Sequence, residues 1–324
     1  MSTIKEISKK TGYSNATISY ALKNDPKIPL ETREKIQQVA KDLKYFPNAS
    51  ARALKTKKSY SIGIFVPGFR GTVHPIILSG IEYVIKHHPT KYKMLVTFMD
   101  EDLSLIYEKQ IDIAVIFGLS ISNEKIIDIS ELIPVILVDN DLEYPNVYSI
   151  NIDNAYGIKQ RVIDFYNKGS RKFMYMLGSG DSMHNIERYN GFEEGIKACG
   201  LNLEEQVVLD AAGFTILCGY ECLKKYLDTN VLESDALICS NDALAIGSLE
   251  VFKERNIKVP QEIRVSGFDN IERCNYTTPP LSTIAVDWYN YGVLLGKKII
   301  SVLENKHFEI SEKFAAHLFD RRSG

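Results

Sequence analysis

The chain has 324 residues, of which 45% are hydrophobic and 25% charged, and a net charge of -2 at pH 7. This length is too great for one small core, so two or three domains are expected. The composition is typical of a globular protein rather than a disordered one. No apolar run approaches the ~20 residues of a membrane span, and the N-terminus is polar from Ser2 onward. We therefore expect a cytoplasmic protein with no signal peptide and no membrane contact.

The cysteines and histidines do not predict a metal site. The five cysteines are odd in number, and only two of them, Cys218 and Cys222, are close in sequence, with no second pair of ligands nearby. None of the six histidines belongs to an HxxxH motif or a Cys-His set. We expect free thiols, no metal and no cofactor.

Charge is divided unevenly along the chain. Residues 1–58 contain 13 Lys and Arg but 5 Asp and Glu, which is a net charge of +8. The other residues contain 26 basic and 36 acidic side chains, which is a net charge of -10. A basic segment on an acidic body is typical of a protein that contacts nucleic-acid phosphates at one end only.

Residues 1–47 are predicted to form three short helices. Thr3 and Glu6 have the spacing of a capping box at the start of the first helix, and Gly12 is suited to its C-terminal end. Ser14 can cap a second helix at about 15–23, so a tight turn separates the two helices, as in a helix-turn-helix. A third helix begins after Pro29 and reaches about residue 43, with apolar residues spaced three and four apart.

The second helix has a polar outer face. Ile18 and Leu22 face the core of the predicted bundle, which leaves short polar and aromatic side chains on the opposite side. An asparagine there can pair with adenine, and an alanine methyl can contact thymine. The alternative is a solvated face of a small bundle, and the basic surroundings favour DNA. The outer residues are Asn15, Ala16, Ser19 and Tyr20.

Two further features point to DNA. Thr32 and Arg33 lie in the first turn of the third helix, where N–H groups, a hydroxyl and a guanidinium can bind phosphate. Asn48 can cap a helix at about 49–54 that is too short to be stable alone. Such a helix could be stable if two copies pair and Leu54 inserts between base pairs in the minor groove. The alternative is that Leu54 packs onto the third helix.

The motifs TIKEIS, GYS, TISYAL, TREKI, LKYFPN and ARALK follow one another in this segment. Residues 3–54 therefore resemble the head and hinge of the LacI/GalR family of bacterial transcription regulators. The resemblance implies that Asn15, Ala16 and Tyr20 read the major groove, although many members have Arg or His where this chain has Tyr20. The residues expected to contact DNA are Thr3, Ser14, Asn15, Ala16, Thr17, Ser19, Tyr20, Asn24, Thr32 and Arg33, with Ala51, Leu54 and Lys55 in the minor groove.

From residue 60 onward, apolar runs alternate with helical stretches. This alternation predicts parallel α/β sheets with right-handed crossovers, although the interval between the second and third strands is short for a crossover helix. The expected strands are 61–67, 93–98, 113–117, 135–139, 173–177, 207–209, 236–240, 263–268 and 314–318. The expected helices are 75–88, 123–130, 155–168, 187–199, 217–227, 242–255 and 288–304.

The body also resembles the LacI/GalR family, through RVIDFYNKGSRKFMYM, ERYNGFEEGI, ICSNDALAIGSLEVFKERNIKVPQEIRVSGFDN and PPLSTIAVD. The resemblance implies an α/β core like that of periplasmic binding proteins, built of two Rossmann-like lobes. We expect a helix-turn-helix domain at 1–47, a hinge helix and linker at 48–58, and an effector-binding and dimerisation domain at 59–324. Lobe 1 would contain about 59–152 plus part of 285–324, and lobe 2 about 153–284. No leucine-heptad tail is present, so a homodimer is expected.

Ligands of such folds gather at the carboxyl ends of the strands. Carboxylates and amides there can bind hydroxyls, an arginine can clamp a diol or carboxylate, and a ring can cover a sugar face. Asp242 is expected to cap the helix that follows it. The resemblance implies effector contacts for Asp139, Arg188, Phe214, Asn241 and Asp269, each of which could instead be a helix cap or a salt bridge.

The loop after the first strand departs from the family pattern. Many members have NPFF there, whereas this chain has FRGTVHP at 69–75. Because the loop faces the ligand in the family, we expect Arg70 and His74 to shape specificity. His74 could equally be a helix-start residue with no ligand role.

The motifs of a nucleophile elbow, a P-loop and a dinucleotide-binding turn do not occur, so an enzyme is not expected. We predict a ligand-responsive, sequence-specific regulator, a repressor that binds a palindromic double-stranded DNA operator as a dimer under control of a sugar or sugar-like effector. One alternative is the same scaffold with a purine effector or a protein corepressor. Another is a cytoplasmic sugar-binding module without specific DNA recognition.

Overall fold

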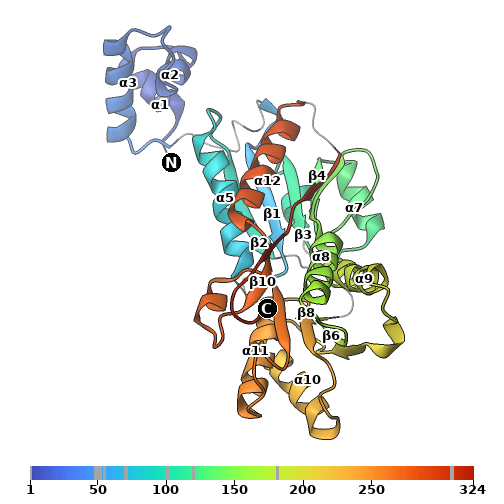
Figure 1. Ribbon diagram of the computed structural model, residues 1–324. Helices are drawn as coiled ribbons and strands as arrows, with labels where there is room; N and C mark the ends of the chain where they lie inside the picture. The colour runs from blue at the N-terminus through green and yellow to red at the C-terminus, as the bar shows by residue number, and fades with distance from the viewer. Residues whose placement is uncertain are drawn as a thin grey trace. The chain divides into compact units, whose positions relative to one another are not determined.

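The computed structural model describes residues 2–46, 53, 56–68, 72–98, 103–118, 121–179, 182–306 and 310–324 (Figure 1). The chain divides into two compact units, Met1–Ser59 and Tyr60–Gly324. Four residues expected to contact DNA or ligand, Ala51, Leu54, Lys55 and Arg70, lie outside the described residues, as does nearly all of the hinge helix expected at 49–54.

The N-terminal unit is a bundle of α1 (Ile4–Thr11), α2 (Asn15–Leu22) and α3 (Leu30–Asp42). Gly12 ends α1 with a φ of 78°, a left-handed conformation that glycine adopts at little cost, and its N–H donates to Ser8 O at 2.8 Å. One apolar stripe from each helix meets the other two in a core of fully or nearly fully buried residues. These are Ile7, Ile18, Ala21, Ile36 and Ala40.

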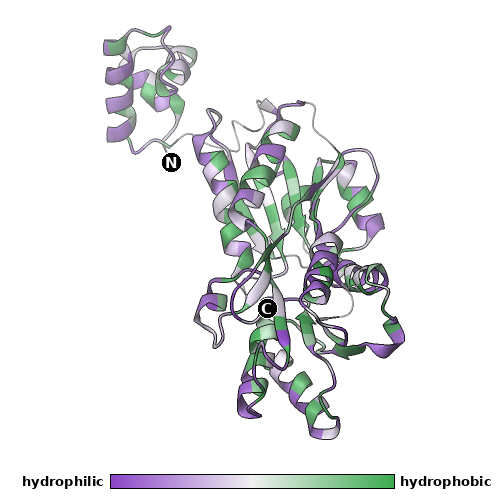
Figure 2. Cartoon of the chain, in the orientation of Figure 1, coloured by the Kyte–Doolittle hydropathy of each residue, from purple (hydrophilic) through white to green (hydrophobic). Residues whose placement is uncertain are grey.

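Lobe 1 of the second unit contains a parallel six-stranded sheet in the order β11-β5-β4-β3-β1-β2. The central strands β1 and β3 are buried along their whole length, which explains their continuous apolar sequences (Figure 2). The strands are β1 (Ser61–Val66), β2 (Lys93–Phe98), β3 (Ile113–Phe117), β4 (Val135–Val138), β5 (Val147–Ile152) and β11 (Ser311–Phe314). The helices are α5 (Val73–His87), α6 (Ser104–Tyr107), α7 (Asn123–Ser130) and α12 (Trp288–Leu303).

Lobe 2 repeats the plan with the strand order β12-β10-β9-β8-β6-β7, and among these described strands only the edge strand β12 is antiparallel to its neighbour. The strands are β6 (Phe173–Leu177), β7 (Val207–Asp210), β8 (Ala236–Cys239), β9 (Arg264–Asp269), β10 (Ser282–Ala285) and β12 (His317–Phe319). The helices are α8 (Asn154–Asn167), α9 (Met183–Ala198), α10 (Ile216–Thr229) and α11 (Asp242–Glu254), with 3₁₀ turns η1 (Leu203–Glu205) and η2 (Glu272–Tyr276).

The chain crosses between the lobes from β5 to α8, from β10 to α12 and from β11 to β12. The third crossing corrects the single strand expected at 314–318. Phe314 is the last residue of β11 in the first sheet, and His317 is the first of β12 in the second sheet. Two short strands replace one because the chain changes sheets between them.

Two strands, β5 and β10, were missed in the sequence. β5 contains Ser149 and Asn151, and β10 contains Ser282 and Thr283, so neither is a continuous apolar run. Two of their serines are nevertheless buried and paired: Ser149 Oγ bonds to Asp141 Oδ1 at 2.7 Å, and Ser282 Oγ accepts the N–H of Arg321 at 2.8 Å. Within the described ranges, no helix is both long enough and apolar enough to span a bilayer.

Candidate nucleic-acid interface and ligand cleft

The outer face of α2 is open to solvent. Asn15 and Ala16 are exposed in its first turn, and Tyr20 is 49% exposed one turn later. Ile18 and Ala21 are fully buried on the other side. The helix therefore presents short groups and one phenol outward from a rigid base, which is the arrangement that a recognition helix needs.

The start of α2 is fixed by its own hydroxyls. Ser14 is the N-cap, and its Oγ accepts the Thr17 N–H at 3.1 Å and lies 2.9 Å from Thr17 Oγ1. At α1, the Thr3 N–H donates to the Glu6 carboxylate at 3.4 Å. Ser19 is half-buried on the flank of α2.

Asn24, at the start of the α2–α3 connection, contacts Arg33 in the first turn of α3. Asn24 has a φ of 59°. Its carbonyl accepts from Arg33 Nη1 at 3.2 Å, and its Oδ1 accepts from Gln37 Nε2 at 2.6 Å. Thr32 precedes Arg33 in the first turn of α3. The bundle thus holds the Arg33 guanidinium beside the end of α2.

In the second unit, a cavity of about 650 Å³ lies between the lobes. Four residues expected at an effector site line it: His74 from lobe 1, and Phe214, Asn241 and Asp269 from lobe 2. This volume is in the usual range for a small-molecule pocket. The other lining residues are Thr72, Val73, Ile216, Ala243, Ile271, Glu272, Arg273 and Tyr276.

Arg188 is buried beside this cavity and held on three sides. Its Nε donates to Asn154 Oδ1 at 2.8 Å and its Nη1 to Ser240 O at 2.5 Å. Its Nη2 lies 3.5 Å from Asp269 Oδ1, a weak contact that leaves this end of the fork available to a ligand. The guanidinium also stacks 3.7 Å from the ring centre of Phe268.

Two carboxylates face the charge of Arg188. Asp139 directly follows β4 in lobe 1, and Asp269 ends β9 in lobe 2. Burial raises the pKa of Asp139 to about 6, although the charge of Arg188 opposes the shift. Burial also raises the pKa of Asp269, again opposed by Arg188. Both residues have positive φ, 62° and 111° respectively, a backbone strain that is concentrated at functional sites.

Aromatic rings occupy the same region. The ring centres of His184 and Phe214 are 5.2 Å apart, and that of His74 is 5.8 Å from Phe117. A side chain at position 178 would collide with the Phe214 ring, so the ring can occupy its position only because residue 178 is glycine. Burial lowers the pKa of His184 to about 3, with smaller contributions from Arg188 and His74, and burial also lowers the pKa of His74. Both imidazoles are therefore neutral at pH 7.

Asn241, and not Asp242, caps α11. Asn241 Oδ1 accepts the Leu244 N–H at 2.9 Å, while its Nδ2 donates to Phe214 O at 3.1 Å. Asp242 is fully buried and accepts from Thr283 Oγ1 at 2.5 Å and from the Ile271 N–H at 2.9 Å. The expectation that Asp242 caps the helix was wrong, because Asp242 is already the first residue of α11 and the capping position before it belongs to Asn241.

Four of the described candidates line the cavity: His74, Phe214, Asn241 and Asp269. Asp139 and Arg188 do not line it, but their charges act on the pKa of the cavity-lining Asp269. Sequence reasoning missed His184, as well as Asn154, which orients Arg188. The reason is that α9 begins at Met183 rather than at residue 187, so Arg188 does not open the helix. His184 and Arg188 are four residues apart, which on a helix places them on one face and could have revealed the pair.

His184 should make the fold sensitive to acid. Its pKa is about 3 when folded and about 6.5 when unfolded, so the unfolded state binds more protons between these values and stability falls as pH drops below 6.5. Relative to His184→Phe, the wild type should lose about 1–2 kcal/mol of unfolding free energy between pH 7 and pH 5.

Urea unfolding of both proteins at the two pH values measures this effect. The raised pKa values of Asp139 and Asp269 act in the opposite direction, so the difference between wild type and variant is the informative quantity. His317→Phe, at an exposed position on β12, is the matched control. Equal pH dependence of wild type and His184→Phe would contradict the expectation.

Known protein families match both units. Residues 3–48 match the model of bacterial regulatory proteins of the lacI family, and residues 162–323, half of the chain, match that of the periplasmic binding protein-like domain. The chain is 27% identical to the HTH-type transcriptional repressor CytR of Escherichia coli K12 over 320 residues, covering 94% of this chain and 91% of the relative. It is 27% identical to the transcriptional repressor PurR of Histophilus somni over 338 residues, covering 98% and 95%. These relatives are transcription regulators and not enzymes.

Solved structures agree in fold. The lac repressor dimer bound to operator and the anti-inducer ONPF superposes with a TM-score of 0.85 at 18% identity, covering 99% of this chain and 98% of that one. The complex of the transcriptional regulator CelR with cellobiose superposes with a TM-score of 0.70 at 18% identity over the whole of both chains. With both units matched by these family models, this chain belongs to the lacI family of bacterial regulatory proteins.

Proposed function

We propose that the protein is a transcriptional repressor that binds a near-palindromic DNA operator as a homodimer and responds to a sugar or sugar-like effector. The observation that carries the proposal is the exposed polar face of α2 on a segment, residues 1–58, with a net charge of +8. Two copies related by two-fold symmetry would present two such faces to successive major grooves. This role places the protein in the cytoplasm, with the DNA, and it requires no catalytic residue.

The cavity between the lobes supports the effector part of the proposal. Carboxylates at Asp139 and Asp269 can accept hydrogen bonds from sugar hydroxyls, and Arg188 Nη2, whose contact with Asp269 is long at 3.5 Å, can donate to a ring or hydroxyl oxygen. The ring of Phe214 can cover an apolar sugar face. Solved relatives include a regulator from Enterococcus faecium with bound ribose and the CelR complex with cellobiose.

The two units would communicate through the equilibrium of the lobes. An effector acts only through its different affinity for two conformations, so a ligand that contacts both lobes favours the closed one. The family resemblance implies that closure alters the dimer interface and the hinge at 48–58. We expect Arg70, Ala51, Leu54 and Lys55 to contribute as the resemblance implies.

A purine effector is the second candidate. The rings of Phe214 and His184 lie beside the cavity and could stack on a nucleobase. One of the similar proteins is the transcriptional repressor PurR. A sugar and a purine would differ in their dependence on the two rings. A nucleobase should lose affinity when His184 becomes a small residue, whereas a sugar held by carboxylates should depend chiefly on Asp139 and Asp269.

The decisive experiment is the selection of binding sites from random duplex DNA by the full-length protein. It is repeated with D-ribose, D-glucose, cellobiose, cytidine and adenosine. Enrichment of one near-palindrome, lost or strengthened by a panel member, is the expected result. DNA binding without sequence preference would instead indicate a sugar-binding module whose basic head attracts anions.

Asn15→Ala should weaken binding to the selected operator by about 10- to 100-fold, because one bidentate contact to a base edge contributes about 1–3 kcal/mol. Binding to random duplex of the same length should change little, since phosphate contacts remain. Gel-shift titration on both DNAs measures the ratio. Gln38→Ala, exposed on α3, is the matched control. An equal loss on operator and random DNA would rule out base reading by Asn15.

A further inference from the structure

The segment 269–276 forms one wall of the cavity, and we call it the cleft turn. Asp269, Ile271, Glu272, Arg273 and Tyr276 all belong to it and line the cavity. It begins with two non-glycine residues in left-handed backbone conformations, since Asp269 has a φ of 111° and Asn270 a φ of 56°. Such conformations persist only where surrounding contacts hold them in place.

One set of contacts holds the cleft turn from inside lobe 2. The buried Asp242 accepts the Ile271 N–H at 2.9 Å. Thr283 Oγ1 donates to Asp242 at 2.5 Å and accepts the Asn270 N–H at 3.4 Å. These bonds fix the backbone of the turn, but they do not involve the side chains at either end.

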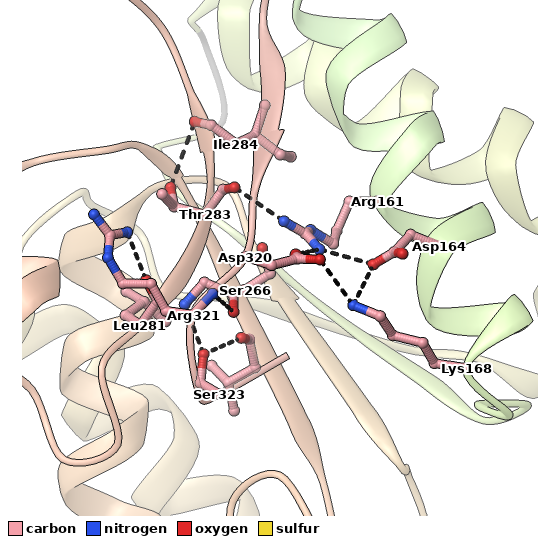
Figure 3. A network of polar contacts seen from close by, with 12 residues as sticks. Arg161, Asp164, Lys168, Ser266, Leu281, Thr283, Ile284, Asp320, Arg321 and Ser323 are labelled. Carbon is pink, nitrogen blue, oxygen red and sulfur yellow. Dashed lines mark hydrogen bonds and ion pairs between the residues drawn. The ribbon is translucent and has the colours of Figure 1, made fainter.

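A second set comes from Arg321, near the other end of the sequence. Its Nη2 donates to Asn270 Oδ1 at 2.8 Å and its Nε to Asn275 Oδ1 at 2.9 Å. Its Nη1 donates to Leu281 O at 2.9 Å (Figure 3). The single planar guanidinium of Arg321 thus hydrogen-bonds to residues near both ends of the cleft turn and to the residue that precedes strand β10. A lysine could not reproduce these three directions.

Arg321 is itself held firmly in place. Its N–H donates to Ser282 Oγ at 2.8 Å. The preceding Asp320 pairs at 2.6 Å with Nη1 of the fully buried Arg161, which also donates from Nη2 to Thr283 O at 3.0 Å (Figure 3). Ser323, also fully buried, donates to Val265 O at 2.7 Å. The guanidinium therefore sits on a rigid base shortly after the third crossing between the lobes.

The second crossing contacts the same turn. Trp288, the first residue of α12, donates from Nε1 to Asp269 O at 2.9 Å. Helix α12 packs against α5 of lobe 1, so this bond joins lobe 1 to the left-handed residue that begins the cleft turn. Trp288 is the single tryptophan of the chain, which makes its fluorescence a direct report on the position of Asp269.

We propose that Arg321 is a positioning residue for the ligand cleft: it fixes Asn270 and Asn275 so that the Asp269 carboxylate stays directed toward Arg188 and the cavity. The inference rests on the proposed function of the cleft as the effector site. It adds a residue that does not line the cavity and assigns to the C-terminal segment a part in ligand binding.

The first test needs no ligand. Arg321→Ala should shift the Trp288 emission maximum to longer wavelength, raise its quenching by acrylamide, and speed hydrogen exchange in the cleft turn. Arg322→Ala is the matched control, because Arg322 is exposed and its described hydrogen bond comes from its backbone N–H. If folded Arg321→Ala matches the wild type in all three measurements, the proposal is wrong.

The second test uses the panel of D-ribose, D-glucose, cellobiose, cytidine and adenosine. For the compound that the wild type binds, Arg321→Ala should bind about tenfold more weakly, the usual effect of losing charged hydrogen bonds. DNA affinity without ligand should stay unchanged. If the wild type binds no panel member, the proposed sugar or purine effector fails, and the ligand-free test still decides the role of Arg321.

Asn270→Gly keeps the left-handed backbone accessible and removes only the amide that Arg321 holds. It should change Trp288 emission in the same direction as Arg321→Ala, and the double variant should show less than the sum of the two effects. Additive effects would overturn the proposal. Should Arg321→Ala fail to fold, Asn270→Gly alone tests the proposal: a shifted emission maximum supports it, and an unchanged one overturns it.

Discussion

Arg188→Ala is expected to weaken effector binding by at least about 100-fold, because a buried charge-assisted contact is lost together with the positive partner of two half-buried carboxylates, Asp139 and Asp269. The charge of this guanidinium opposes the raised pKa values of both Asp139 and Asp269. Without it, both pKa values should rise further and both groups should be partly protonated at pH 7. Neither carboxylate would then be a full acceptor for ligand hydroxyls.

Calorimetric titration with the best panel ligand measures the loss. The variant should still bind operator DNA, so that in a reporter assay transcription no longer responds to the ligand. Arg171→Ala is the control: Arg171 is exposed before β6, at the opposite end of the strand from the cavity, and stacks on Tyr166. Retention of wild-type affinity in folded Arg188→Ala would remove Arg188 from the site.

Operator affinity is expected to fall by about 1,000-fold between 50 and 200 mM salt, as for proteins that neutralise several phosphates and release their counterions. The head segment of each chain carries a net charge of +8, whereas the body carries -10. The body should therefore repel DNA, and nearly all of the salt dependence should arise in the head.

Arg33→Gln tests this assignment. If Arg33 contacts one phosphate in each protomer, the slope of log affinity against log salt should decrease by about 2 for the dimer. Lys197→Gln, which removes a charge from the last turn of α9, should leave the slope unchanged. A change of less than tenfold over the salt range would contradict the proposed phosphate contacts. A steep slope without preference for the palindrome would support the rival sugar-binding module.

Much of the fold could be predicted from local patterns. The capping residues Thr3 and Ser14 and the C-terminal Gly12 located the first two helices because caps satisfy backbone groups within a few residues of sequence. The continuous apolar runs located β1, β3 and β4, whose residues are buried on both faces. β5 and β10 were not predicted because polar residues interrupt their apolar runs, and the partner that satisfies Ser282, Arg321, lies 39 residues away in the sequence.

The candidate cleft was predicted in part. Polar residues that follow parallel strands lie at the carboxyl edge of their sheet, which is why Asp139 could be selected in one lobe and Asp269 in the other. His184 could not, because its importance arises from burial against Phe214 and Arg188. Asp242 was misassigned because a carboxylate next to a helix start looks like a cap until its buried partner Thr283 is known.

The sequence by itself determined the helix-turn-helix, the division of charge and the family, since each depends on residues that are neighbours along the chain. Only the tertiary structure decided which groups act together. Arg321 lies 51 residues from Asn270 in the sequence. Asp139 and Asp269 belong to different lobes, and their charges interact only because the folded lobes face each other. The hydrogen bonds of a guanidinium and the raised pKa of a carboxylate depend on burial and on distances in the folded chain. The spacing of residues along the sequence determines neither burial nor these distances.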